Sequence, residues 1–335
     1  MTRLPAIGVI ANPAAGRDVR RLMSWATPVS QAEKVHAVLR LLASAGALGL
    51  REAWLMPDAS GLSARIADKA RAARQAGETD LPEIRMLPLE TRGEQGDSRA
   101  AAAMLRDLGV GAIAVLGGDG THRQVAQGCG QVPLLALSTG TNNAFPTLRE
   151  PTLAGMALAL YLRGAVAAEL ALQRNKQLRV RGPQGEAIAL VDVVVSHQRA
   201  LGARAVYEAR QVHSVYAAFA RPDAIGLSSI AAYAHPVTRS QPWGCHVRLG
   251  DGRALQVPLM PGVVQRVGVL QAARLLPGQA QALPPLAATL AFDGEREWVL
   301  DPRQACSIEL ELDGPRTVGV EAILAHAAQH GLLYG

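Results

Sequence analysis

The sequence predicts an α/β protein with two domains, an open and mostly parallel sheet followed by an antiparallel, β-rich domain. Over the first 150 residues, short apolar runs alternate with segments of helical spacing, which is typical of a parallel sheet covered by helices on both faces. From about residue 165, short strands follow one another across hairpin-like turns, which indicates antiparallel pairing. The length of 335 residues also fits two domains better than one.

The predicted division is residues 1–150, residues 151–315 and a last segment, 316–335, whose helix we expect to pack back on the first domain. In the first domain, buried strands are expected at 6–11, 53–56, 84–87, 112–116 and 133–137. Helices are expected at 33–45, 60–76 and 97–108, the last with Asp97 or Ser98 as N-cap, and from a first turn at 124–127. In the second, strands are expected at 178–181, 187–195, 246–249, 263–270, 288–292, 298–300 and 306–312. Turns are expected at Gly182-Pro183 and at residues 250–252, and a final helix at 320–329.

Composition narrows the classes of function. Hydrophobic residues make up 49% of the chain, enough for ordinary cores, and the net charge is +6. The positive charge is spread along the chain without a dense Lys/Arg block, so we expect no nucleic-acid partner. A bias toward small anionic ligands such as nucleotides fits the same charge.

The cysteines and the apolar runs indicate the compartment. Cys129, Cys245 and Cys306 are far apart and form no CxxC pair, so neither structural zinc nor a disulfide framework is expected. The longest apolar region, 153–162, stops at Arg163 and is too short to span a bilayer. We therefore expect a cytoplasmic protein that does not enter a membrane.

A glycine-rich turn is the strongest local signal. Gly117-Gly118-Asp119-Gly120-Thr121 follows the apolar run 112–116 and precedes a helix. The free amides at a helix start form an anion site, most often for phosphate. A carboxylate there, Asp119, suits metal binding or proton acceptance from an attacking hydroxyl. An ordinary tight turn closed by an Asx hydrogen bond is the alternative.

Two further loops follow predicted strands of the same sheet. One starts at Asn12-Pro13 and has Arg17 close by, and the other runs from Ser138 to Phe145. Because ligands of open parallel sheets lie at the carboxyl ends of the strands, the three loops are expected to share one site. The predicted nucleotide-binding residues are Asn12, Gly16, Arg17, Gly117, Gly118, Gly120, Thr121, Thr139, Gly140, Thr141, Asn142 and Asn143.

These motifs, with Phe292-Asp293-Gly294-Glu295, resemble the NAD kinase and diacylglycerol kinase-like superfamily, and most closely its acetoin catabolism protein X branch. The resemblance covers nearly the whole chain. It implies a Rossmann-like first domain, a β-sandwich-like second domain and an active site in the cleft between them. It also implies ATP with Mg²⁺ as phosphate donor, NAD as substrate and a homodimer or higher homo-oligomer. By the same resemblance Asp119 is the general base, Asp192, Ser228 and Ser229 bind substrate, and Asp293 and Glu295 hold metal.

Two departures keep the substrate open. Val191 stands where NAD kinases carry an asparagine before the acid Asp192, and Gln124 stands where lipid kinases carry a glutamate. A phosphotransferase acting on NAD or a related nucleotide hydroxyl is therefore one interpretation. A non-catalytic nucleotide-binding regulator or accessory protein of acetoin catabolism is the second. A lipid kinase of the diacylglycerol type is the third.

Overall fold

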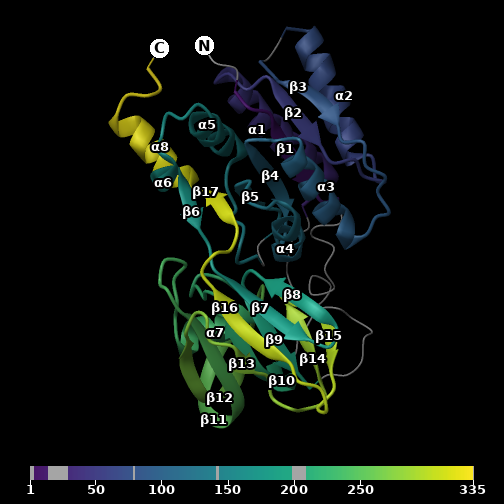
Figure 1. Ribbon diagram of the computed structural model, residues 1–335. Helices are drawn as coiled ribbons and strands as arrows, with labels where there is room; N and C mark the ends of the chain where they lie inside the picture. Colours follow the sequence, from purple (N-terminus) through teal and green to yellow (C-terminus); the bar gives the residue numbers. More distant parts are fainter. Residues whose placement is uncertain (1–3, 14–28, 78–79, 141–142, 198–208, 335) are drawn as a thin grey trace.

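The computed structural model describes residues 4–13, 29–77, 80–140, 143–197 and 209–334. It confirms the predicted fold class, with a parallel sheet in the N-terminal domain and antiparallel sheets in the C-terminal domain (Figure 1). The two domains lie one above the other in this view, and the chain crosses between them twice, after β6 and before β17.

The first domain is built on a seven-stranded sheet of order β3-β2-β1-β4-β5-β17-β6. Neighbours from β3 to β5 pair in parallel, whereas β6 runs antiparallel to β17. Every residue of β1 and β4 is buried, which explains why both read as continuous apolar runs. The strands are β1 (Ile7–Ala11), β2 (Glu52–Leu55), β3 (Glu83–Met86), β4 (Ala112–Gly117), β5 (Leu134–Ser138), β6 (Leu172–Arg174) and β17 (Arg316–Val318).

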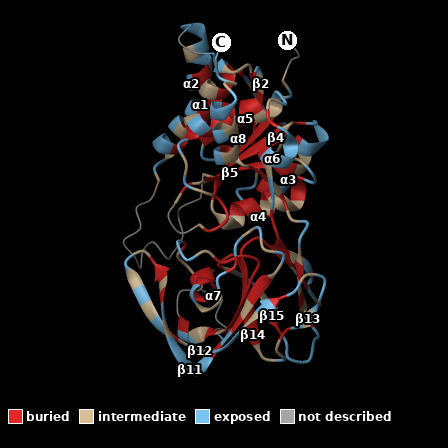
Figure 2. Ribbon diagram, turned by 90° about the vertical axis from the view of Figure 1, so that its left-hand side faces the viewer, coloured by how far each residue is buried: buried red, intermediate tan, exposed pale blue. Residues whose placement is uncertain are grey.

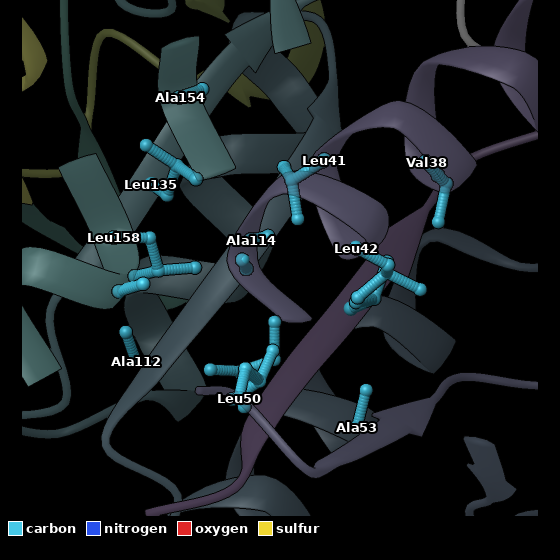
Figure 3. Packing of buried hydrophobic residues seen from close by; sticks show 14 of the residues in the cluster. Val38, Leu41, Leu42, Leu50, Ala53, Ala112, Ala114, Leu135, Ala154 and Leu158 are labelled. Carbon is cyan, nitrogen blue, oxygen red and sulfur yellow. The ribbon is translucent and has the colours of Figure 1, made fainter. Parts of the chain in front are cut away.

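Helices cover both faces of this sheet. They are α1 (Gln31–Ala47), α2 (Leu62–Gln75), α3 (Gln95–Asp107), α4 (Asp119–Gly128), α5 (Pro151–Leu162), α6 (Ala168–Ala171) and α8 (Val320–Gln329). On one face, Leu41 and Leu42 of α1 pack with Leu158 of α5 over the strands (Figure 3). On the other face, α3 and α4 supply Leu105 and Val125 to a second core. The helix α3 begins earlier than predicted, because Glu94 is its N-cap and Asp97 closes a capping box from inside the helix.

Two antiparallel sheets form the second domain. One has the order β12-β11-β10-β9-β14-β15 and the other β13-β16-β7-β8. Their facing side chains form one core, and α7 (Ser228–Ala234) covers the opposite face of the larger sheet, where it is largely buried (Figure 2). The strands are β7 (Gln177–Gly182), β8 (Gly185–Ala189), β9 (Asp192–Ser196), β10 (Val212–Ala217), β11 (Gly244–Met260), β12 (Val263–Leu275), β13 (Gln281–Ala282), β14 (Ala288–Phe292), β15 (Glu295–Leu300) and β16 (Ser307–Glu311), with a 3₁₀ turn at Ala209–Gln211.

Two predicted features of the second domain are wrong. The single strand at 187–195 is two strands in different sheets, β8 and β9, because Leu190 and Val191 donate their amides to the Asp293 carboxylate instead of to a strand. The predicted turn at 250–252 lies inside the long strand β11, where the pairing register with β12 shifts. Gly252 is needed there because a Cβ would lie 2.1 Å from the Val269 carbonyl oxygen.

The first domain extends past the predicted boundary at residue 150. The helix α5 packs on α1, and β6 joins the first sheet before the chain enters the second domain. After the second domain, β17 returns to pair with β5, and α8 packs against α5 through the buried Val320 and Ile323. In the described part of the chain no helix is long and apolar enough to cross a membrane.

Candidate functional site

The glycine-rich turn joins β4 directly to α4. The helix begins at Asp119, and its N-cap Gly118 provides no side chain to cap the first-turn amides. A Cβ on Gly117 would lie 2.6 Å from the Thr121 Cβ, and one on Gly118 would lie 2.9 Å from Asn143 Oδ1. Glycine is therefore required at position 117, where the Cβ of Thr121 blocks a side chain, whereas at position 118 the end of the Asn143 side chain would have to move. The positive end of the helix dipole faces the same place.

The loops that follow β1, β4 and β5 meet at this turn. Asn12 Nδ2 donates to Thr121 Oγ1 at 2.9 Å, which ties the first loop to α4. Asn143 Nδ2 donates to Ser138 Oγ at 2.7 Å, and its side chain reaches Gly118. Thr139 is buried and Gly140 half-buried in the same loop. The predicted binding residues Gly16, Arg17, Thr141 and Asn142 lie outside the described residues.

Asp119 is held by the backbone of the third loop. Its Oδ1 accepts from Phe145 N at 2.8 Å and from Ala144 N at 3.1 Å, and its Oδ2 accepts from Ala144 N at 3.0 Å. Such bonds favour the ionised form of a carboxylate and fix its orientation. Asp119 is only half-buried, so its carboxylate is oriented without being sealed from a ligand.

Arg239, which belongs to the second domain, forms hydrogen bonds with the same two loop residues, Ala144 and Phe145. Its guanidinium donates to the carbonyl oxygen of Ala144 at 2.9 Å and to that of Phe145, and it stacks over the rings of Phe145 and Phe219. Ala144 and Phe145 themselves belong to the core of the second domain. Arg239 was not predicted from the sequence, since one arginine in a polar turn carries no periodic or motif signal. The structure makes it the partner of Asp119 in joining the domains.

A second carboxylate cluster surrounds Arg123 of α4. Arg123 is fully buried, its Nε lies 3.5 Å from Asp293 Oδ2, and its Nη1 donates to Glu297 Oε2 at 3.0 Å. Asp293 also accepts from the amides of Leu190 and Val191, at 3.1 and 2.8 Å. Burial raises the pKa of Asp293 to about 7, the Arg123 charge lowers it, and the Asp119 charge raises it. Asp119 and Asp293 are therefore close enough to interact electrostatically.

Asp293 and Glu295 do not fit a protein-built magnesium site. Magnesium ligation needs oxygens that face an open cation position. The oxygens of Asp293 face backbone amides and the guanidinium of Arg123, which already supplies the positive charge. Glu295 Oε2 accepts from Gln95 Nε2 at 2.6 Å. Within the residues described, no group of three or more His, Cys, Asp or Glu side chains is placed to hold a metal ion.

The predicted substrate-binding residues are only partly brought to the site. Asp192 is buried at the start of β9, and its carbonyl oxygen accepts from the Asp293 amide at 2.9 Å, next to the Arg123 cluster. Ser228 and Ser229 are buried at the start of α7, on the far face of the larger sheet. The Ser229 hydroxyl lies 2.6 Å from the Gly226 carbonyl oxygen, so it stabilises its own turn.

Two further polar residues stand directly behind the loops. Lys34 of α1 is buried, and its Nζ donates to the carbonyl oxygens of Asn12 and Pro13, at 3.2 and 2.9 Å. The helical spacing of apolar residues predicted this helix but gave no role to Lys34. His122 is buried in α4 with Nδ1 at 2.8 Å from the Gly118 carbonyl oxygen, and burial lowers its pKa to about 4. A neutral imidazole donating to that carbonyl therefore supports the turn at neutral pH.

The glycine-rich strand-turn-helix and the antiparallel second domain define a two-domain protein of the NAD kinase-like class. The model of the ATP-NAD kinase N-terminal domain matches residues 7–166, and that of the acetoin catabolism protein X C-terminal domain matches residues 176–313. Acetoin catabolism protein X of Cupriavidus necator is 40% identical, over 98% of this chain and 94% of that protein. The chain belongs to the acetoin catabolism protein X family, as its motifs predicted.

One solved structure, a Bifidobacterium longum chain described as a prolidase, is 15% identical over 47% of this chain and 38% of that one. Its TM-score is 0.15, so it carries no argument about this fold.

Proposed function

We propose that the protein is an ATP-dependent phosphotransferase that acts on a hydroxyl of NAD or a related nucleotide, with Asp119 as general base. The observation that carries the proposal is the convergence of three strand-end loops on a half-exposed carboxylate whose orientation two backbone amides fix. Proteins of the NAD kinase family typically use ATP and a divalent metal ion, and the match to that family supports the same pair here.

Each residue has a defined part in this proposal. The uncapped amides of α4, with the side chains of Asn12, Thr121 and Asn143, would hold the donor phosphates. Lys34 adds positive charge behind the first loop. Asp119 would take the proton of the acceptor hydroxyl, because two backbone amides orient its half-buried carboxylate at the start of α4. Phosphoryl transfer depends on such alignment and charge neutralisation more than on covalent chemistry.

The test is direct. The purified protein is incubated with Mg-ATP and, separately, NAD, NADH or diacylglycerol, and the phosphorylated product is identified by mass spectrometry. We expect product from NAD or NADH, strongly reduced product from Asp119→Asn, and normal product from Asp68→Asn, which removes an exposed acid on α2. Equal turnover by Asp119→Asn and the wild type would refute the role of Asp119.

A second candidate is a non-catalytic nucleotide-binding accessory protein of acetoin catabolism. It is favoured by Arg123, whose guanidinium fills the acidic cluster of Asp293, Glu295 and Glu297. The name of the Cupriavidus necator relative supports the metabolic setting. On this alternative, ATP or NAD raises the melting temperature but no product forms. If millimolar ATP, ADP, NAD and NADP all leave the melting curve unmoved, both candidates fail.

A further inference from the structure

A cavity of about 610 Å³ lies between the two domains. The first domain lines it with β5, β17 and the start of α8, which Figure 1 shows together in the upper domain. The second domain lines it with residues 220–222 and 236–241. Phe145 and Arg239 border the cavity, but Asp119, Asn12 and Asn143 do not. It is therefore a space separate from the site around the glycine-rich turn.

The charged side chains that line this cavity all carry positive charge. Arg149, Arg221 and Arg239 line it, and no Asp or Glu among the described residues does. Burial, together with the charges of Arg221 and Arg149, lowers the pKa of Arg239 to about 10, although the charge of Asp119 acts in the opposite direction. The three guanidinium groups therefore interact. Arg221 is paired with the exposed Asp223, whereas Arg149 has no hydrogen bond or ion pair with any residue that the structure describes. Converging like charges destabilise a fold unless an anion compensates them.

Other features of the lining suit a particular ligand. Gly319 and Val320, at the uncapped start of the ten-residue helix α8, face the cavity and add the positive end of a helix dipole. Leu135, Phe145 and Val237 provide an apolar wall. The volume falls within the range of about 300–1,000 Å³ that is usual for small-molecule sites.

We propose that this cavity binds a small organic phosphate with an apolar body, the phosphate between Arg149, Arg221 and the start of α8, and the body against Leu135 and Phe145. The proposal goes beyond the phosphotransferase proposal and does not depend on it. Arg239 connects the two places, since it borders the cavity and also donates to the carbonyls of Ala144 and Phe145, whose amides hold Asp119.

The test measures binding of phenyl phosphate and of inorganic phosphate to the full chain by isothermal titration calorimetry. The double variant Arg149→Gln/Arg221→Gln is compared with the matched control Arg71→Gln/Arg303→Gln. The control also removes one ion-paired arginine, Arg71 with Asp68, and one exposed arginine of a loop, and thus the same total charge. Asn12→Ala is the third variant, because it removes a hydrogen bond to Thr121 in the loops around Asp119 and Asn12 does not line the cavity.

We expect the wild type to bind phenyl phosphate more tightly than inorganic phosphate. The cavity variant should lose about tenfold or more in affinity, while the control and Asn12→Ala stay within about twofold. Arg149→Gln alone, which breaks no contact with the described chain, should weaken binding measurably even if the double variant fails to fold. Absence of binding, equal losses in both double variants, or a loss confined to Asn12→Ala would each overturn the proposal.

Discussion

Asp119 and Asp293 are two aspartates in neighbouring places with opposite surroundings. Each accepts hydrogen bonds from backbone amides of a segment far away in the chain. Asp119 is half-buried at the start of a helix, whereas the Asp293 side chain is fully buried against Arg123. The same residue type therefore serves two purposes. An oriented and accessible carboxylate can take part in chemistry, while a buried one with its own cation joins α4 to the second domain.

The largest expected effect is that of replacing Asp119, the accessible aspartate of the two. Asp119→Asn should lower phosphoryl transfer by a factor on the order of 10²–10⁴, because an amide cannot accept the proton of the acceptor hydroxyl. Nucleotide affinity should hold or rise, since a charge that repels phosphate is gone. Rate, affinity and melting temperature are measured on one preparation. A rate that falls only in proportion to the folded fraction would mean that Asp119 acts solely as a link to the third loop.

The role of the buried Asp293 is tested by replacing its cationic partner, Arg123. Arg123→Met should destabilise the fold by about 3–5 kcal/mol, because Glu297 and the buried Asp293 lose the cation that lies between them. Urea unfolding measures this cost. Adding Asp293→Asn should recover part of it, giving a coupling energy in the double-mutant cycle. Arg40→Gln, which breaks an exposed pair with Glu150, is the control and should cost at most about 1 kcal/mol. Similar costs for Arg123→Met and Arg40→Gln would contradict the comparison.

Asp293 and His122 are expected to change the stability of the fold in opposite directions as the pH rises. Burial raises the pKa of Asp293 from 3.8 to about 7, so the folded state keeps a proton that the unfolded state releases, and this contribution to stability falls as pH rises through that window. Burial lowers the pKa of His122 from 6.5 to about 4, so its contribution rises with pH over that range. The two trends oppose each other in the wild type below the ordinary histidine pKa.

Asp293→Asn should therefore turn a flat profile into a rising one. Relative to the variant, wild-type stability should fall by about 1.4 kcal/mol per pH unit across the Asp293 window. Urea unfolding at about pH 4.5, 5.5 and 6.5 measures the difference. Parallel profiles for the two proteins would show that the pKa of Asp293 is not raised.

The smallest expected effect concerns Gly117 and Gly120, which flank Asp119 in the chain. Gly117→Ala should destabilise the fold by about 1–3 kcal/mol, because the new Cβ would lie 2.6 Å from the Thr121 Cβ. Gly120→Ala should cost less than about 1 kcal/mol, since its Cβ would meet only the flexible end of Glu295, at 3.1 Å, and alanine favours the helix. Thermal unfolding of both variants checks the order, and the reverse order would contradict the packing described for this turn.

The local sequence pattern was enough to predict most strands and helices of the first domain and several elements of the second. The strand at 288–292 and the helix at 320–329 have the bounds that their periodicity predicted. The glycine-rich turn was predicted because a buried strand, its glycines and the following helix are adjacent in the chain. The short strand β17 was missed, because three residues have no readable period and join the sheet only by pairing with β5 and β6.

The sequence by itself determined the fold class, the family and the three loops around Asp119, since all of these depend on apolar period and on motifs of adjacent residues. Only the tertiary structure decided that Arg123 lies next to Asp293, a carboxylate that was expected to hold metal. It also decided that Arg239 forms a hydrogen bond with Ala144, whose amide orients Asp119. It also decided that three arginines from separate segments meet in one cavity. The Arg123–Glu297 and Arg239–Ala144 contacts join residues that are 174 and 95 positions apart in the chain. The energies of such contacts depend on burial and distance, which no local pattern contains.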